Sequence, residues 1–98
     1  MLTLSQIRQD LKDIRYYYDR KRMFDQAAKD VGTCAIVNTV NIYNEVIRNA
    51  PPKLYDLYVS LYINNKTQEA LSIELSYTPE YIQMLNKRML KYLQTNLI

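Results

Sequence analysis

The chain has 98 residues, of which 48% are hydrophobic and 23% are charged. This length and composition predict one globular domain or two small helical units. A formal net charge of +3 is mildly basic. It excludes a polycationic protein that coats nucleic acid through its overall charge, but it is compatible with a local basic surface.

The residue types that most catalytic and metal sites need are scarce. The sequence has no histidine, a single cysteine and a single glycine, which excludes His-dependent triads, thiol-rich zinc sites and glycine-rich phosphate loops. Acidic pairs such as Asp10 and Asp13 stand in a highly charged segment, so we expect solvated surface carboxylates there and not a catalytic pair. We therefore expect a protein that is not an enzyme and that needs neither a cofactor nor a metal.

The lone cysteine and the hydropathy pattern indicate a compartment. Cys34 stands next to Ala35, Ile36 and Val37, which predicts a buried thiol, and a single thiol cannot form an intramolecular disulfide. The N-terminus is interrupted by charge within eight residues, and no apolar run approaches the roughly 18 residues that span a bilayer. We expect a cytoplasmic protein without membrane contact.

Helix signals appear from the first residues onward. With 1 glycine and 3 prolines the chain has few turn residues for a sheet, so the predicted fold class is all-α with about five helices. Thr3 and Gln6 form a capping box, and a first helix is expected from about residue 4 to Asp30. Its apolar face shifts near residues 19–22, where a bend is expected. The stripe ahead of the bend consists of Ile7, Leu11, Ile14 and Tyr18.

A second helix is predicted from about Cys34 to Asn49. Gly32 can adopt the left-handed conformation that closes the first helix, and Thr33 can cap the second. Pro51 and Pro52 then end this helix, because proline lacks the amide proton that a helix interior needs. The apolar residues of this helix form more than a narrow stripe: Ile36, Val40, Tyr43, Ile47 and Ala50 on one side, widened by Val37, Ile42 and Val46.

The first helix also carries three tyrosines, residues 16–18, followed by the cations of residues 20–22. These groups can contact nucleic acid by stacking and by meeting phosphates. Alternatively, at least one tyrosine belongs to the core and the aspartates pair with nearby cations. We favour the second interpretation, a scaffold or dimer surface. The heptad-like run of the stripe either pairs with a second copy or packs on the second helix, and the intramolecular choice is favoured.

A third helix, from about Lys53 to Ile63, is expected to end at Asn64 and Asn65, which tolerate the left-handed closing position. Thr67 can then cap a short helix in which Ala70, Leu71 and Leu75 supply buried contacts, with Glu69 near its positive end. The small Ser72 leaves room for a neighbouring helix. After Ser76 and Tyr77, Thr78 caps the next helix, Pro79 takes its first position and Glu80 follows. Two helices joined by a tight turn predict a helix-turn-helix.

The last helix, about residues 79–94, has two different sides. Its core side is predicted to consist of Ile82, Leu85, Met89, Leu90 and Leu93. The opposite side carries donors, acceptors and cations suited to base edges and phosphates. An ordinary solvated helix face is the alternative, and the turn signals ahead of the helix favour DNA binding. The predicted face consists of Glu80, Tyr81, Gln83, Met84, Lys87, Arg88 and Lys91.

Residues 54–93 resemble region 4 of the sigma-70 family, the helix-turn-helix that reads the promoter −35 element. The resemblance rests on the apolar helix LYDLYVSLYI, the pattern T-x-E-x-L-x-x-x-L from Thr67, and the pattern T-x-E-x-I-x-x-L-x-x-x-x-L-x-x-L from Thr78. It implies base contacts from Pro79, Glu80, Gln83 and Met84, and phosphate contacts from Thr67, Thr78, Tyr81, Lys87 and Lys91. In sigma factors these positions are often rich in arginine, whereas Pro79, Tyr81, Gln83 and Met84 stand there in this chain.

The chain has no room for the sigma region that melts the −10 element. Its size and composition are similar to the small sigma-region-4-like regulators of phages and mobile elements, including activators of the ArpU and RinA type. We therefore expect an N-terminal scaffold or dimerisation region at residues 1–50 and a DNA-binding region at residues 51–98.

Three functions remain open. The first is a sequence-specific transcriptional regulator, an activator, that binds double-stranded DNA, as a homodimer if its site is palindromic. The second is an adaptor that binds RNA polymerase through Tyr81, Met84 and Tyr92. The third is a DNA-binding packaging subunit of a phage.

Overall fold

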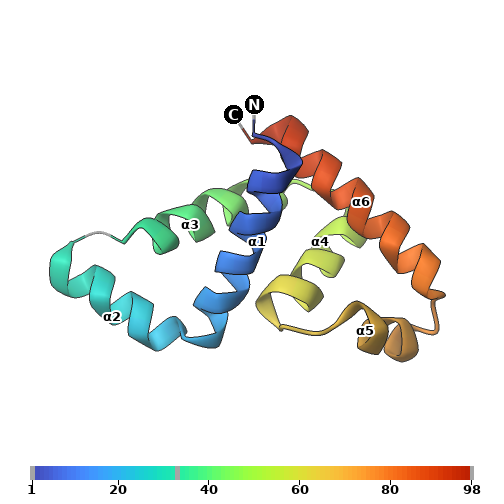
Figure 1. The fold of residues 1–98 in the computed structure, drawn as a ribbon, viewed down its shortest axis with the longest axis horizontal. Coiled ribbons are helices and arrows are strands. Elements are labelled where there is room, and N and C mark those ends of the chain that lie inside the picture. The colour runs from blue at the N-terminus through green and yellow to red at the C-terminus, as the bar shows by residue number, and fades with distance from the viewer. Residues whose placement is uncertain (1, 33, 98) are drawn as a thin grey trace.

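The computed structural model describes residues 2–32 and 34–97, and all regular elements in this part of the chain are helices, with no strand (Figure 1). The all-α fold class is therefore confirmed. In chain order the elements are α1 (Leu4–Asp19), α2 (Lys21–Val31), α3 (Ala35–Ile47), α4 (Pro52–Tyr58), the π-helical segment η1 (Val59–Ile63), α5 (Gln68–Leu75) and α6 (Pro79–Asn96).

The predicted first helix is two helices in the structure. The break falls at Arg20, whose backbone (φ −130°, ψ 36°) leaves the helical region, within the segment where a bend was expected. The capping box of Thr3 and Gln6 is present at the start of α1. Gly32 closes α2 with φ 81°, as predicted, while the predicted cap Thr33 lies outside the described residues. The second predicted helix begins and ends slightly inside its expected limits, as α3.

The third predicted helix changes its winding part-way along. After Tyr58 the chain continues as η1, and the Asn64 amide donates to the Val59 carbonyl over 2.8 Å, a bond five residues long. Asn65 has φ 56°, so the predicted left-handed closing residue is confirmed at that position. Nothing in the sequence pattern indicates the π-helical winding, since the same apolar residues suit an α-helix.

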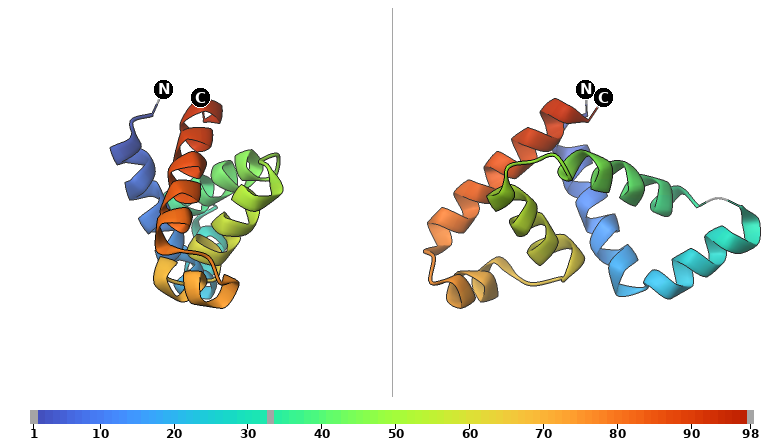
Figure 2. Two further views of the ribbon diagram at one scale, coloured as in Figure 1. Left: turned by 90° about the vertical axis from the view of Figure 1, so that its right-hand side faces the viewer. Right: turned by 180° about the vertical axis from the view of Figure 1, so that it is seen from behind.

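Helix α1 lies at the centre of the molecule, with α3 on one side and η1 and α6 on the other (Figure 1). The start of α1 and the end of α6 lie close together (Figure 2). There the Gln94 side chain donates to the Leu2 carbonyl over 3.1 Å. Ile7, Leu11 and Ile14 are buried inside this single chain, which confirms the intramolecular packing of the α1 stripe. One cluster of buried side chains joins residues from before and after the two prolines.

Several burial predictions are wrong. Leu75, expected to be buried, is 46% exposed at the end of α5, and Ala70 is also exposed. Ile42 is 57% exposed, because it lies on the side of α3 that the neighbouring helices leave uncovered. Cys34 is half-buried, not buried, since it precedes α3 in a connecting segment.

None of the described helices is long and apolar enough to cross a lipid bilayer.

Candidate nucleic-acid interface

The starts of α5 and α6 are fixed by threonine caps, as the sequence predicts. The Thr67 hydroxyl oxygen accepts the Ala70 amide over 3.0 Å, and the Thr78 hydroxyl oxygen accepts the Tyr81 amide over 3.2 Å. Each bond satisfies an amide that has no partner within its own helix. Pro79 occupies the first turn of α6, where a missing amide proton costs nothing. Both threonines are exposed.

The turn between α5 and α6 is held by its own residues. Ser76 closes α5 in the left-handed conformation (φ 56°). The Ser72 hydroxyl donates to the Tyr77 carbonyl, and the Tyr77 amide donates to the Ser72 carbonyl over 3.0 Å. Ser72 is only 6% exposed, so the small residue does stand where the two helices approach each other. The direction of α6 relative to α5 is therefore set by local bonds.

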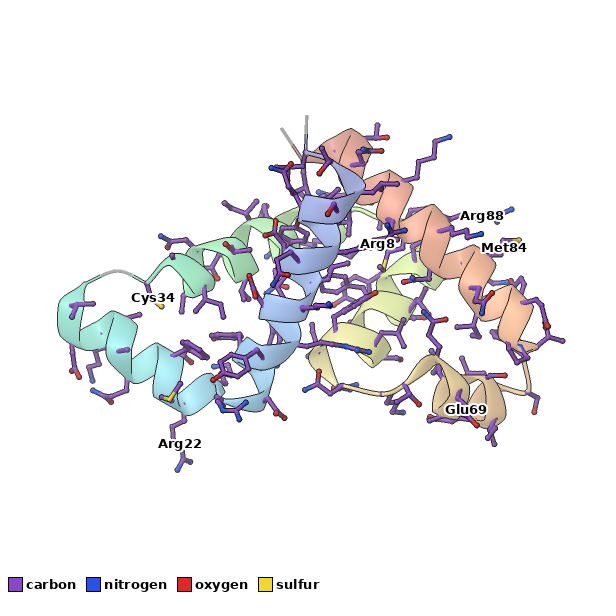
Figure 3. All side chains as sticks on the ribbon, in the orientation of Figure 1. Arg8, Arg22, Cys34, Glu69, Met84 and Arg88 are labelled. Carbon is purple, nitrogen blue, oxygen red and sulfur yellow. The ribbon has the colours of Figure 1, made fainter. Side chains whose placement is uncertain are left out.

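Helix α6 buries one side and exposes the other. The five predicted core residues are all buried: Ile82, Leu85, Met89, Leu90 and Leu93. Figure 3 shows Met84 and Arg88 projecting away from the body of the protein. The exposed side, called the reading face below, consists of Pro79, Glu80, Gln83, Met84, Lys87, Arg88 and Lys91.

The cations of the reading face have no acidic partners. Within the described residues, ion pairs join Asp19 to Arg20, Lys21 to Asp25, Glu45 to Arg48 and Glu74 to Lys66. Lys87, Arg88 and Lys91 take part in none of them. Three unpaired positive charges within about one turn and a half of helix form a local basic surface on a chain whose net charge is small.

Tyr81 differs from the other predicted contact residues because it is half-buried and bonded inside the chain. The Lys53 ammonium group donates to the Tyr81 hydroxyl oxygen over 3.0 Å and lies 5.7 Å from the centre of its ring. The Tyr77 ring packs edge-on at 4.8 Å. The hydrogen bond to Tyr81 raises the pKa of Lys53 above its usual value. Lys53 was not among the predicted contacts, because its place beside α6 depends on how α4 packs.

Three side-chain hydrogen bonds from α1 and η1 position this region. The Arg15 guanidinium donates through Nε to the Leu61 carbonyl over 2.8 Å and through Nη2 to the Lys66 carbonyl over 3.0 Å. The Tyr62 hydroxyl donates to Asn86 Oδ1 over 3.0 Å. These bonds hold the segment ahead of α5 against α1, and η1 against α6. They join residues 24 to 51 positions apart, so no local sequence signal could have indicated them.

Two of the three tyrosines in the α1 segment have hydroxyl groups that are bonded inside the chain. Tyr17 is buried and its hydroxyl donates to Asp25 Oδ1 over 2.6 Å. Asp25 also accepts from Lys21 over 2.6 Å, and these bonds, from Lys21 first and then from Tyr17, lower the pKa of its carboxyl. The Tyr18 hydroxyl accepts from Asn44 over 3.0 Å. Only Tyr16 is exposed, beside the Arg20 guanidinium at 4.3 Å from its ring.

No metal centre is evident: in residues 2–32 and 34–97, no three His, Cys, Asp or Glu side chains come close enough to hold an ion. The sequence matches no protein-family model, and comparisons with curated proteins and with solved structures found no significant match. A function for this chain therefore has to be inferred from the chemistry of its own surface.

Proposed function

We propose that this protein is a sequence-specific DNA-binding transcriptional regulator. In this proposal α5 and α6 form a helix-turn-helix whose second helix enters the major groove. The observation that carries it is the reading face of α6, where three cations without acidic partners lie beside an exposed glutamine and an exposed methionine. Resemblance of residues 54–93 to sigma region 4 supports the same placement of α6.

The proposed contacts divide into two kinds. Gln83 can bond the edge of adenine with its amide, and Met84 offers an apolar contact to a thymine methyl group. Lys87 and Lys91 neutralise phosphates, which strengthens binding to every sequence. Glu80 can accept from the amino group of cytosine and repels a phosphate, so it favours sequence discrimination over affinity.

Two substitutions test the proposal on a duplex taken from upstream of the gene for this protein, compared with a scrambled duplex. Replacing Gln83 with Ala should reduce the preference for the upstream duplex by about 1–3 kcal/mol, because a base contact is lost. Replacing Lys87 with Gln should weaken both duplexes by the same factor and reduce the slope of log affinity against log salt by about 1. Fluorescence anisotropy across a salt series measures both effects.

Lys29→Gln is the matched control, because Lys29 is an exposed lysine on α2, far from α6 (Figure 1). It should leave affinity and slope at their wild-type values. If Gln83→Ala and Lys87→Gln also bind both duplexes as the wild type does, α6 is not the recognition helix.

A second candidate function is an adaptor that binds RNA polymerase. It is favoured by an apolar hollow between α4, α5 and the start of α6, in which Leu75 and Tyr77 are partly exposed beside the buried Leu57 and Leu71. Such a hollow suits the apolar side of a short helix from a partner protein. The interface that the sequence suggests for an adaptor, Tyr81, Met84 and Tyr92, is less available. Tyr92 is half-buried, and its hydroxyl donates to the Val46 carbonyl. Co-purification of polymerase by a protein that binds no duplex would favour the adaptor.

A further inference from the structure

A shallow hollow opens beside the reading face, between the start of α4 and the middle of α6. Its floor includes the buried side chains of Leu54 and Leu85. Lys53, Tyr81 and Arg88 stand at its edge, and Figure 3 shows Arg88 on the outer side of α6. The hollow therefore combines two cations, one hydroxyl group and an apolar floor.

The two cations at this hollow lack acidic partners. Neither Lys53 nor Arg88 belongs to an ion pair in the described part of the chain. Asp56 follows Lys53 by three residues and is exposed, yet it does not pair with the lysine either. Arg88 acts on Lys53 as a like charge that lowers the pKa of the lysine, against the larger raising effect of Tyr81. An anion placed between them would replace repulsion by two attractions.

The hydrogen-bond donors of this cluster are also available. The Lys53 ammonium group has three protons, of which one is used on the Tyr81 oxygen. Because that oxygen accepts from Lys53, the Tyr81 hydroxyl proton remains free to donate. The Arg88 guanidinium makes no hydrogen bond within the described residues and can bind two oxygens of one anion side by side.

We propose that Lys53, Arg88 and the Tyr81 hydroxyl bind a phosphodiester group of the DNA backbone at the edge of the major groove. This inference rests on the proposed function and adds a contact from α4 that lies outside the helix-turn-helix. Tyr81 and Arg88 occupy the border of the exposed side of α6, next to Met84. With the centre of that side facing the bases, its border faces the sugar-phosphate strand.

The test compares Lys53→Gln, Lys53→Arg and Tyr81→Phe with the control Lys29→Gln, on both the upstream and the scrambled duplex. Loss of one phosphate contact reduces the salt slope by about 0.9. When the salt rises from 50 to 200 mM, the factor by which affinity falls should therefore be about three times smaller for Lys53→Gln than for the wild type. This difference should be equal on both duplexes. Lys53→Arg should retain the wild-type slope, and Tyr81→Phe should weaken both duplexes without changing it.

A Lys53→Gln variant that matches the wild type in affinity and slope, while Lys87→Gln weakens binding, overturns the phosphate site and leaves the proposed function standing. A second readout follows the Arg88 Nε–H and Tyr81 ring signals by NMR during addition of inorganic phosphate. We expect shifts in the wild type that are absent in Lys53→Gln. Shifts with inorganic phosphate but no binding of either duplex would overturn the backbone contact and the proposed function together. Circular dichroism confirms that each variant is folded.

Discussion

Two fully buried tyrosines have opposite surroundings. The Tyr43 hydroxyl donates to Asp10 Oδ2 over 2.7 Å, which joins α3 to α1. The Tyr58 hydroxyl has no hydrogen-bond partner among the described residues. A buried hydroxyl that donates to a carboxylate stabilises the fold, whereas one without a partner loses its bonds to water and gains none. The tyrosine hydroxyl therefore stabilises the fold at position 43 and destabilises it at position 58.

Substitution with phenylalanine should separate the two. Tyr43→Phe should lower the free energy of unfolding by about 1–2 kcal/mol, because a hydrogen bond to a charged group is lost. Tyr58→Phe should leave the free energy of unfolding unchanged or raise it by up to about 1 kcal/mol. Urea unfolding at pH 7 measures both, with Tyr16→Phe on the exposed side of α1 as control. Equal losses at positions 43 and 58 would contradict this difference.

At the residue scale, the features predicted correctly are those that depend on residues close together in the sequence. The caps at Thr3, Thr67 and Thr78 are bonds to residues three positions away, so the sequence pattern contains both partners. Leu75 was placed in the core wrongly, because its exposure depends on whether another element covers the end of α5. The contact of Lys53 with Tyr81 was missed for the same reason, since 28 residues separate the two.

At the element scale, Arg15 connects helix α1 to the segment that leads into α5. Its guanidinium meets the carbonyls of Leu61 and Lys66, which have left the regular α-helical pattern, and it lies 5.2 Å from the centre of the Tyr62 ring. The π-helical winding of η1 leaves carbonyl groups near its end in need of donors. Arg15, from another helix, satisfies the Leu61 carbonyl of η1 and also the Lys66 carbonyl in the segment beyond it.

Replacing Arg15 with Met keeps much of the side-chain volume but removes both donors. We expect a loss of about 2 kcal/mol in the free energy of unfolding, and faster hydrogen exchange in α5, because the segment ahead of it is no longer held. Arg15→Lys should recover only part of the loss, since one ammonium group cannot meet both carbonyls in the same geometry. Arg22→Met is the control, because Arg22 points away from α2 into solvent (Figure 3). Unchanged exchange in α5 would show that Arg15 does not hold this segment.

Element limits followed from the sequence where the breaking residue is chemically distinctive. Gly32 ends α2, and Pro52 begins α4 after Pro51, as these residue types require. The break at Arg20 was expected only as a bend, because residues 20–22 are good helix formers and tertiary packing decides the outcome. The π-helical turn of η1 had no signal at all. Helix positions are thus local properties, while their winding and partners come from the folded chain.

At the scale of the whole molecule, four elements each contribute a buried or half-buried tyrosine to the packing of the chain. Tyr17, Tyr43, Tyr58 and Tyr62 come from α1, α3, α4 and η1, and burial is the first cause that raises the pKa of each hydroxyl above its ordinary value near 10. Hydrogen bonds to Asp25 and Asp10 raise the pKa of Tyr17 and Tyr43 further. The fold therefore keeps protons that the unfolded chain releases at high pH.

This difference predicts that stability falls in alkaline solution. Below about pH 10 these tyrosines are protonated in both states, and their contribution to stability is fully present. Above pH 10 the unfolded chain loses protons while the folded chain retains them, so the free energy of unfolding decreases as the pH rises. The ion pair of Lys21 with Asp25 acts in the same direction, since its hydrogen bond raises the pKa of Lys21.

Urea midpoints should be level from pH 7 to 9 and should fall at pH 10 and 11. Tyr43→Phe should show a shallower fall than the wild type, because one of the tyrosines with a raised pKa is gone. A midpoint that stays level to pH 11 would mean that these hydroxyls ionise equally in both states, and that the central packing of α1 is looser than the structure has it.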